Sequence, residues 1–357
     1  MQKAALKSAT REILARAYYA TRHYLPRLKG KVLILNYHRI LPRDNLPLSA
    51  PVQPGMYVFS DAFEDQIRFL SKHFSVLSFT ELLERWNDSS LDSEGRYCVI
   101  TFDDGWIDNY LHAFPILKRY GMPATIFLPT ALIGTDRWFW PDKLAYLFQK
   151  GFASAGTNDT ANVSSFLENR FPWLAPLANG TDGESIDGII EKCKMQPLEE
   201  INEFLETASS SLGIKFPAER VLMHWGEVEA MSREKISFGS HSCTHRILTT
   251  LTPREVQQEV EESFQTLRSN CRNAVPVLAY PNGNYNIEVA ELVKAAGYRA
   301  AASTRFGYEG RSPTELFSLR RVGVHQDLSA TTPLFTLHLA GGNQFLKVPS
   351  FLAGRTS

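Results

Sequence analysis

Residues 99–109 read V-I-T-F-D-D-G-W-I-D-N, and the rest of the chain is best understood outward from this stretch. The apolar run at 98–102 is typical of a buried strand, and it ends on Asp103 and Asp104, followed by Gly105. Because neighbouring side chains of an extended chain point in opposite directions, the two aspartates can take different roles, one toward a metal and one toward a substrate. The alternative is a turn with a helix N-cap, which Asp and Gly also favour.

Strand-like and helix-like segments alternate on both sides of this stretch. Strands are predicted at 31–39, 75–79, 124–129, 235–240, 299–304 and 319–327, and helices at 61–72, 80–86 (capped by Thr80), 108–120, 252–269 (capped by Thr252) and 286–296. This alternation predicts an α/β fold with a parallel sheet or barrel, whose working residues gather at the C-terminal ends of the strands. His38 also falls at such an end, either as a residue near the substrate or as a histidine that bonds a loop.

The composition limits the class of protein. The 357 residues, 44% of them hydrophobic, fit one α/β barrel with insertions. The 38 basic residues balance the 38 acidic ones, and no nucleic-acid-binding motif occurs, so nucleic acid is not expected as a partner. The four cysteines lack C-x-x-C spacing and are predicted to be reduced, buried thiols, which favours a reducing compartment.

Residues 1–30 contain seven Lys and Arg and one acidic residue, Glu12, with apolar residues at roughly helical spacing. They predict a basic amphipathic helix. Such a helix either lies on an anionic membrane surface or packs on the domain with its charges solvated. No signal-peptide core and no run of about 18 or more apolar residues occurs, so we expect a cytoplasmic protein, with peripheral contact at the inner membrane face permitted through residues 1–30.

Between about residues 132 and 225 the alternation stops. The segment turns polar at 151–165 and then helical and acidic at 184–212, which indicates an insertion in the barrel. Its aromatic residues could stack on sugar rings or form core, and Trp140 is the candidate for substrate binding. The predicted organisation is a helix at 1–30, a barrel at 31–330 with this insertion, and a C-terminal helix and tail at 331–357.

The strand at 235–240 leads into H-S-C-T-H, which contains His241 and His245. Two histidines four residues apart at a strand end can place both imidazoles on one side of the backbone, close enough to share a metal. The alternative is a pair of surface histidines near a helix start. A strand-tip aspartate would complete the ligand set of a catalytic Zn²⁺ or a similar divalent ion.

Three motifs in order, T-F-D-D-G at 101–105, H-S-C-T-H at 241–245 and Y-P-N-G at 280–283, resemble the motif set of the polysaccharide deacetylase family, the NodB-homology domain of carbohydrate esterase family 4. The resemblance extends from about residue 32 to residue 324, apart from the insertion. It implies a distorted (β/α) barrel of about seven strands. It also implies an enzyme that removes acetyl from an N-acetylated sugar on a metal centre.

The resemblance also implies roles for individual residues. Asp103 would be the general base, and Asp104 would bind the metal with His241 and His245. The ligand types favour Zn²⁺ over Co²⁺, Ni²⁺ or Mn²⁺. A metal that polarises the acetamide, with a carboxylate that takes the proton of the attacking water, meets the main demands of the reaction.

The third motif and a late histidine would complete the site. The resemblance implies that the backbone N–H of Asn282 stabilises the oxyanion. Tyr280 and Asn282, both in this motif, are therefore predicted to bind the substrate. The leaving amine is protonated by a late histidine in the family. His325, in the stretch 319–327, is the candidate for this general acid, and His338 is its rival.

One departure from the family concerns Ala279, which stands where many members have an arginine beside the catalytic aspartate, so the charge partner of Asp103 is open. A-Y-P-x-G and N-Y-H-R at 36–39 resemble a subgroup that acts on exopolysaccharide or surface-glycan precursors. We therefore expect a metal-dependent hydrolase that removes acetyl from an N-acetylated saccharide of a bacterial-type surface glycan or its precursor. A hydrolase of non-sugar amides, a sugar O-acetyl esterase and a non-catalytic glycan-binding barrel remain alternatives.

Overall fold

The computed structural model describes residues 2–44, 46–47, 54–152, 169–171, 186–194 and 196–342. The chain divides into two compact units. The first contains most of residues 1–135 together with residues 222–357, and the second is mainly Asp136–Val221. The second unit therefore occupies most of the segment predicted as an insertion at about 132–225.

The first unit is built on a closed barrel of seven parallel strands in its described residues. In order around the barrel they are β1 (Lys31–Tyr37), β10 (Leu319–Gly323), β9 (Ala300–Phe306), β8 (Ala274–Ala279), β7 (Ile236–Ser240), β6 (Ala124–Leu128) and β5 (Arg96–Phe102). The barrel closes because β5 pairs with β1 along its whole length. The short strand β4 (Ser75–Val76) extends the sheet beside the first half of β5. The α/β barrel expected from the sequence is confirmed.

Alternate residues of the strands belong to two different clusters of buried apolar side chains. Leu33 and Leu35 of β1 pack with side chains of α3 (Ser60–His73), whereas Val32 and Ile34 pack with side chains of α4 (Phe79–Asn87) and of strands across the barrel. Both faces of β1 are therefore buried, as expected when helices cover a parallel sheet. This explains why β1 reads as a nearly continuous apolar run.

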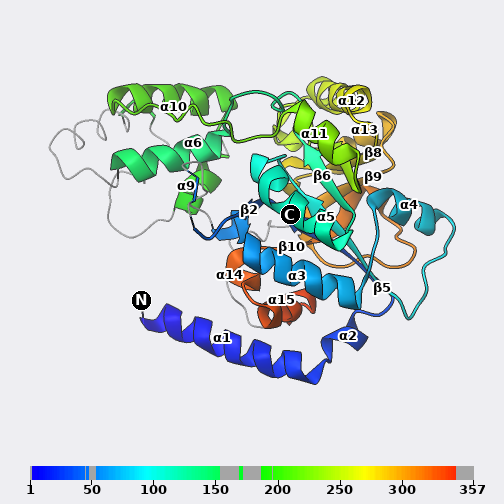
Figure 1. Ribbon diagram of the computed structural model, residues 1–357. Coiled ribbons are helices and arrows are strands. Elements are labelled where there is room, and N and C mark those ends of the chain that lie inside the picture. Colours follow the sequence, from blue (N-terminus) through cyan, green and yellow to red (C-terminus); the bar gives the residue numbers. More distant parts are fainter. Residues whose placement is uncertain are drawn as a thin grey trace. The chain divides into compact units, whose positions relative to one another are not determined.

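Helices surround the strands (Figure 1). Besides α3 and α4 they are α5 (Phe114–Tyr120), α11 (Trp225–Ser232), α12 (Pro253–Asn270) and α13 (Ile287–Ala295). The predicted cap of α12 at Thr252 is confirmed, and it is part of a capping box, because Thr252 and Glu255 exchange hydrogen bonds at the start of the helix. The predicted cap of α4 was wrong: the helix begins at Phe79, and the hydroxyl of Ser78 rather than Thr80 accepts the bond from Glu81.

Two other predicted boundaries also need correction. The helix expected at 108–120 is divided into a π-helical turn, η2 (Asn109–Ala113), and α5. The strand expected at 319–327 ends at Gly323, and the short helix α14 (Gln326–Ser329) follows, so His325 precedes that helix rather than ending the strand. A second small parallel pair, β2 (Arg39–Leu41) and β3 (Tyr57–Phe59), lies outside the barrel strands.

The N-terminal helix of the prediction is divided into α1 (Gln2–Thr21) and α2 (Tyr24–Arg27). Helix α1 packs on α15 (Thr332–Leu339), so the two ends of the described chain meet on the first unit. Among the described residues, no helix is both long and apolar enough to cross a bilayer.

The second unit has its own apolar core. Helices α6 (Trp140–Leu147), α9 (Ile186–Cys193) and α10 (Leu198–Ser211) contribute to it, and the π-helical turn η3 (Phe148–Phe152) follows α6. The polar stretch predicted at 151–165 lies almost entirely outside the described residues. All four cysteines of the chain are free and buried, as predicted.

Candidate active site

The loops at the C-terminal ends of β5, β7 and β8 contain most of the unusual backbone conformations. Six non-glycine residues of the described chain have positive φ, and four of them, Asp104, Ser242, His245 and Asn282, lie in these three loops. Each such conformation costs about 1–3 kcal/mol and persists only where the surrounding structure enforces it. The three sequence motifs are therefore held in shapes that an ordinary turn would not require.

The first loop turns sharply after β5. Asp103 still follows the strand, because its N–H donates to Tyr37 of β1 at 2.9 Å. Asp104 and Gly105 then both adopt left-handed conformations, with φ of 74° and 69°. Glycine is favoured at position 105, because its φ is one that other residues rarely adopt and a Cβ there would lie 2.7 Å from a methyl carbon of Leu128.

Asp104, His241 and His245 come together at this end of the barrel. The Oδ1 of Asp104 lies 3.3 Å from the Nε2 of His241 and 3.2 Å from the Nε2 of His245. One ligand atom from each residue lies within 4.8 Å of those of the other two. The side chains of Asp104 and His241 are 6% and 3% exposed, whereas that of His245 is 27% exposed, so the cluster is reached from the His245 side.

Hydrogen bonds orient the side chains of His241 and Asp104 and hold the backbone of His245. The Nδ1 of His241 lies 2.7 Å from the carbonyl oxygen of Ala279, so Nδ1 carries the proton and Nε2 faces Asp104. The indole N–H of Trp106 donates to the Oδ2 of Asp104 at 2.9 Å, which leaves Oδ1 for the histidines. The N–H of His245 donates to the hydroxyl of Ser242 at 3.0 Å.

The arrangement fits a divalent metal. Two donors that each lie about 2.0–2.1 Å from a tetrahedral zinc ion are about 3.3 Å apart, which matches the two distances from Asp104. Two imidazoles and one carboxylate are also a ligand set that leaves a coordination position open for water or substrate. Asp104, His241 and His245 are therefore a candidate metal site, as predicted, but the distances do not identify the metal.

Asp103 faces a different partner, Arg321 of β10. The two terminal nitrogens of Arg321 donate to the two carboxylate oxygens of Asp103, each at 2.8 Å. The side chains are 0% and 2% exposed. Burial acts to raise the pKa of Asp103, but the charges of Arg321 and His241 outweigh it and hold the pKa below its ordinary value.

Arg321 is the charge partner of Asp103, which the sequence analysis left open. Its guanidinium contacts Asp103, which is where the sequence analysis expected the arginine that is absent at Ala279, and the backbone carbonyl of Ala279 bonds His241. Two further bonds, to Asn36 and to the carbonyl of Ser303, fix its guanidinium. Its signal in the sequence was the pair Arg320–Arg321 within a predicted strand: one of two adjacent residues must point into the barrel, where a charge needs a carboxylate.

A second buried pair lies beside the first loop. The Nε of Arg39 donates to the Oδ2 of Asp108 at 2.8 Å, and the N–H of Ile40 donates to Oδ1, also at 2.8 Å. The guanidinium of Arg39 lies 4.3 Å from the ring centre of Trp106, the residue that bonds Asp104. Burial raises the pKa of Asp108 above its ordinary value, and Arg39 offsets only part of that rise.

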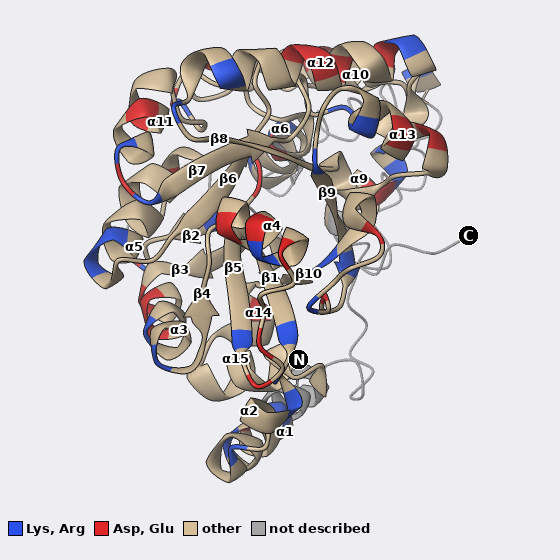
Figure 2. Ribbon diagram, turned by 90° about the vertical axis from the view of Figure 1, so that its right-hand side faces the viewer, with Lys and Arg blue, Asp and Glu red and all other residues tan. Residues whose placement is uncertain are grey.

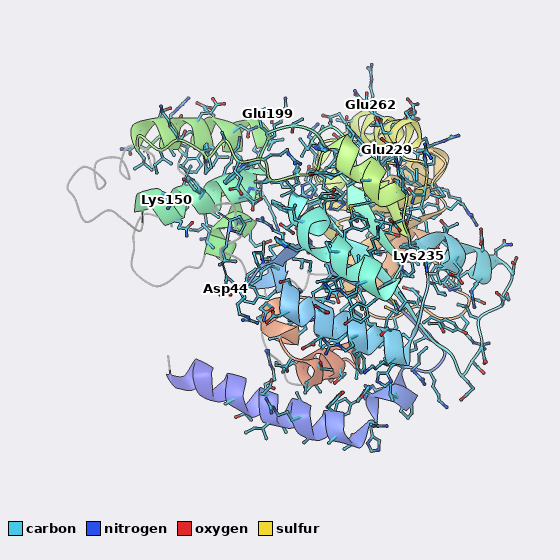
Figure 3. The ribbon with its side chains drawn as sticks, in the orientation of Figure 1. Asp44, Lys150, Glu199, Glu229, Lys235 and Glu262 are labelled. Atoms are coloured by element: carbon cyan, nitrogen blue, oxygen red, sulfur yellow. The ribbon has the colours of Figure 1, made fainter. Side chains whose placement is uncertain are left out.

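Glu259 of α12 holds the loop between the two candidate histidine ligands. Its buried carboxylate accepts bonds from the N–H groups of Cys243 and Thr244, at 2.8 and 2.9 Å, and from the Thr244 hydroxyl. Glu262, labelled in Figure 3, lies one turn further along α12 on its exposed side. The sequence analysis did not identify Glu259, although acidic residues follow the histidine motif at helical spacing.

Three histidines are candidates for the general acid. The Nε2 of His38 lies 4.0 Å from the Oδ2 of Asp103. Burial lowers the pKa of His38. Its Nδ1 is buried without a hydrogen-bond partner among the described residues. His325 instead pairs with Asp327 at 3.4 Å. The Nε2 of His338 lies 2.7 Å from the carbonyl oxygen of Gly323. The predicted role of His325 stays a prediction.

Two of the predicted substrate-binding residues lie in the third loop. The side chain of Tyr280 is fully buried and its hydroxyl donates to the carbonyl of Phe317, so its backbone is the part that could contact a substrate, and its role in substrate binding stays a prediction. Asn282 is exposed, and its side-chain amide donates to Asn284. Gly283 is required there, because a Cβ would meet Thr304 at 2.1 Å.

Trp140, the third predicted substrate contact, lies at the start of α6 in the second unit. It is partly buried against the core of that unit. Its neighbour Trp138 is also core, with its indole N–H bonded to the carbonyl of Glu219. The role of Trp140 on a substrate stays a prediction.

Comparison with known proteins places these residues in a family. The family described as "Polysaccharide deacetylase" matches residues 91–157 and 214–301. A Bacillus subtilis protein named as a polysaccharide deacetylase, YxkH, is 23% identical over 303 residues, which are 85% of this chain and 74% of that protein. The poly-beta-1,6-N-acetyl-D-glucosamine N-deacetylase of Staphylococcus epidermidis is 34% identical over 117 residues, 31% of this chain.

This chain spans only 40% of the Staphylococcus epidermidis protein and 51% of the Staphylococcus aureus protein of the same name. Among solved structures, the Streptococcus pyogenes deacetylase PplD in complex with acetate aligns with a TM-score of 0.55 at 20% identity, covering 86% of this chain and 98% of that one. IcaB from Ammonifex degensii aligns with a TM-score of 0.52 at 15% identity, covering 86% and 97%. Identities this low show the shared fold alone.

Proposed function

Because the chain belongs to the polysaccharide deacetylase family, we propose that it is a metal-dependent hydrolase that removes acetyl groups from an N-acetylated saccharide of a bacterial-type surface glycan or its precursor. The class of substrate is supported by relatives that are named for poly-beta-1,6-N-acetyl-D-glucosamine. These relatives are longer than the matched region, so their activity is carried to this chain as a proposal.

One observation supports the proposal above all others: Asp104 faces two imidazoles while the adjacent Asp103 faces a guanidinium. The first set of contacts suits a metal site, and the second keeps a carboxylate charged without using it as a ligand. A divalent ion held by Asp104, His241 and His245 would polarise the acetamide carbonyl and lower the pKa of water. Zn²⁺ is the ion we propose, with Co²⁺, Ni²⁺ and Mn²⁺ as substitutes of similar ligand preference.

Asp103 is proposed as the general base. Its carboxylate takes a proton from the water that attacks the acetamide carbon, and Arg321 keeps the carboxylate ionised and oriented for that transfer. The negative charge that develops on the carbonyl oxygen needs donors, and the backbone N–H of Asn282, in the strained third loop, is the proposed one. The products are acetate and a free amine on the sugar.

The leaving amine needs a proton, and we propose His38 as its donor in preference to His325. His38 is next to the proposed base, and its side chain is 20% exposed, so it can reach a bound substrate. His325 and His338 are engaged with Asp327 and Gly323 instead. Replacing His38 by Gln should therefore lower kcat by about 100-fold or more, whereas the same change at His325 should have a smaller effect.

Arg321 also bears on the alternatives. The case for a non-catalytic barrel rested on Ala279, where the arginine of the family is absent. Because Arg321 provides a guanidinium to Asp103, that departure no longer speaks against turnover. The proposed cytoplasmic location rests on the sequence alone.

The proposal is tested with zinc-loaded protein and β-1,6-linked oligomers of N-acetylglucosamine. We expect equal amounts of acetate and free amine, lost on chelation and in Asp104→Asn, and restored to the chelated wild type by zinc. Acetate released from O-acetylated sugars alone would support the esterase alternative. Glycan binding by the metal-loaded protein without product would support the binding barrel, and either result would overturn the deacetylase proposal.

A further inference from the structure

The outward side of α1 contains exposed apolar residues among those whose side chains the structure describes. Ile13 and Leu14 are 68% and 48% exposed, two of the five large apolar residues that are exposed in the described chain. Ala17 and Ala20, one and two turns beyond Ile13, are exposed on the same side. Ile13 and Leu14 lie outside the apolar core formed by the described residues of the first unit.

The opposite side of α1 attaches the helix firmly to the first unit. Ala15 is fully buried, and Tyr19 stacks on Tyr24 of α2 with ring centres 5.7 Å apart. Arg11 donates to the carbonyl of Asp327, and the hydroxyl of Thr331 bonds the carboxylate of Glu12 at 3.2 Å. Helix α1 therefore presents Ile13 and Leu14 from a fixed position on α14 and α15.

Residues 1–30, which include α1 and α2, carry an excess of positive charge. Residues 1–30 contain seven Lys and Arg, and their single acid, Glu12, is paired with Arg16 at 3.0 Å and bonded to Thr331 on the packed side. The exposed Arg16 and Lys29 pair with Glu12 and Glu94, whereas Arg22 and Arg27 are exposed beside the end of α1 and in α2. Figure 2 shows the Lys and Arg positions in blue along α1 and α2.

We propose that α1 docks on the surface of a bilayer that contains anionic lipid. Ile13 and Leu14 enter the boundary between headgroups and acyl chains, and the basic side chains beside them face the lipid phosphates. Two copies of the chain facing each other through α1 would bring like charges together, so charge complementarity favours an anionic surface over a second copy. This docking is independent of the proposed deacetylase reaction, and it would place the barrel beside a lipid-linked or membrane-associated glycan.

Sedimentation with lipid vesicles tests the docking on the full chain. We expect the protein to sediment with vesicles that contain phosphatidylglycerol, not with pure phosphatidylcholine, and to dissociate at high salt. In the double variant Ile13→Gln and Leu14→Gln, the partition coefficient should fall at least about tenfold. The matched control is Leu111→Gln with Ile287→Gln, which removes two apolar residues of similar exposure elsewhere and should bind like wild type.

Thermal unfolding of each variant checks that the fold is intact. We expect it to be intact, because all four substituted positions are exposed. Equal vesicle binding by the wild type and the α1 double variant would overturn the proposal. Absence of binding to anionic vesicles by the folded wild type would also overturn it. Light scattering tests whether a second copy of the chain binds this side of α1 instead. A wild-type dimer that becomes monomeric only in the α1 double variant, together with no vesicle binding, would mean that it does. Acetate release by the same samples reports separately on the proposed function.

Discussion

Two buried arginine–aspartate pairs flank the first loop, and the pKa of the aspartate is shifted in opposite directions in the two pairs. In the pair Arg321–Asp103 the side chains are 0% and 2% exposed, and in the pair Arg39–Asp108 they are 1% and 4% exposed. Both pairs join a residue of the 103–108 loop to a residue in or beside the barrel strands. Burial is therefore equal, and the difference between the pairs must come from the surrounding charges and hydrogen bonds.

The pKa of Asp103 is held below its ordinary value, because Arg321 bonds both oxygens and the charge of His241 adds to it against the effect of burial. The pKa of Asp108 is raised, because burial outweighs Arg39 and the N–H of Ile40. A proton acceptor in catalysis must be ionised, so the first pair suits a general base. The second pair suits a structural link that positions Trp106 beside Asp104.

The largest effect is expected when the first pair is broken by Arg321→Gln. Asp103 would then be buried without its cation, so its pKa should rise and kcat should fall by about 100-fold or more. The free energy of unfolding should also fall by about 3–5 kcal/mol. Deacetylation rates and denaturant unfolding measure the two effects.

The matched control for this change is Arg320→Gln. Arg320 is the adjacent residue of β10, and it pairs with Glu309 instead of with the site. Its variant should keep kcat within about threefold of wild type, because the charge on Asp103 is unchanged. Equal losses in the two variants would contradict a specific role of Arg321.

Breaking the second pair with Arg39→Gln should mainly affect stability. A buried Asp108 without its cation should lower the free energy of unfolding by about 3–5 kcal/mol, while kcat falls by about tenfold at most. Denaturant unfolding and kinetics of the same sample give both values. Arg43→Gln removes an exposed pair with Asp61, with side chains 53% and 59% exposed, and should change stability by about 1 kcal/mol or less. A kcat loss in Arg39→Gln as large as in Arg321→Gln would erase the distinction between the pairs.

Trp106 contacts both Arg39 of the second pair and Asp104 of the candidate metal site. The variant Trp106→Phe tests whether this link matters for metal binding. Phe keeps a ring for Arg39 but cannot donate to Asp104, so metal affinity should fall by about 10–100-fold with little change of fold. Titration with zinc measures the affinity. Trp86→Phe is the control, because that indole bonds the carbonyl of Gly310 away from the site, and its zinc affinity should equal that of wild type.

The smallest effect concerns the pH dependence of stability. The pKa of Asp108 is raised in the fold above its unfolded value of about 3.9, so the folded state binds the proton more tightly. Stability from this group is present at low pH and is lost as pH rises through the folded pKa. The difference in free energy of unfolding, Asp108→Asn minus wild type, should therefore increase as pH rises from about 4 toward neutrality. A constant or decreasing difference would contradict the raised pKa.

The sequence predicted the parts of the site that depend on local pattern. Strand ends follow from apolar runs, and the C-terminal ends of parallel strands meet at one end of a barrel, so Asp104 and the two histidines could be expected to lie together. Arg321 could not be matched to Asp103 in the same way, because the two residues are 218 positions apart and nothing in either segment names its partner. The alternation of Arg320 and Arg321 was the only local hint.

Other differences have physical reasons of the same kind. The burial of the Tyr280 side chain could not be predicted, because it comes from stacking on Tyr285 and a bond to Phe317, and the sequence contains no pattern for either contact. The strand before His325 ends early at Gly323, so the direction of that histidine could not follow from strand alternation. His38 was visible at a strand end, yet its distance from Asp103 depends on how β1 pairs with β5.

The division of roles between two adjacent aspartates is tested most directly by measuring bound zinc and acetate release in Asp103→Asn and Asp104→Asn. The account predicts that Asp103→Asn binds about one zinc per chain, as wild type does, and turns over at least about 100-fold more slowly. It predicts that Asp104→Asn loses both zinc and turnover. Zinc loss in Asp103→Asn, or full turnover in either variant, would contradict it.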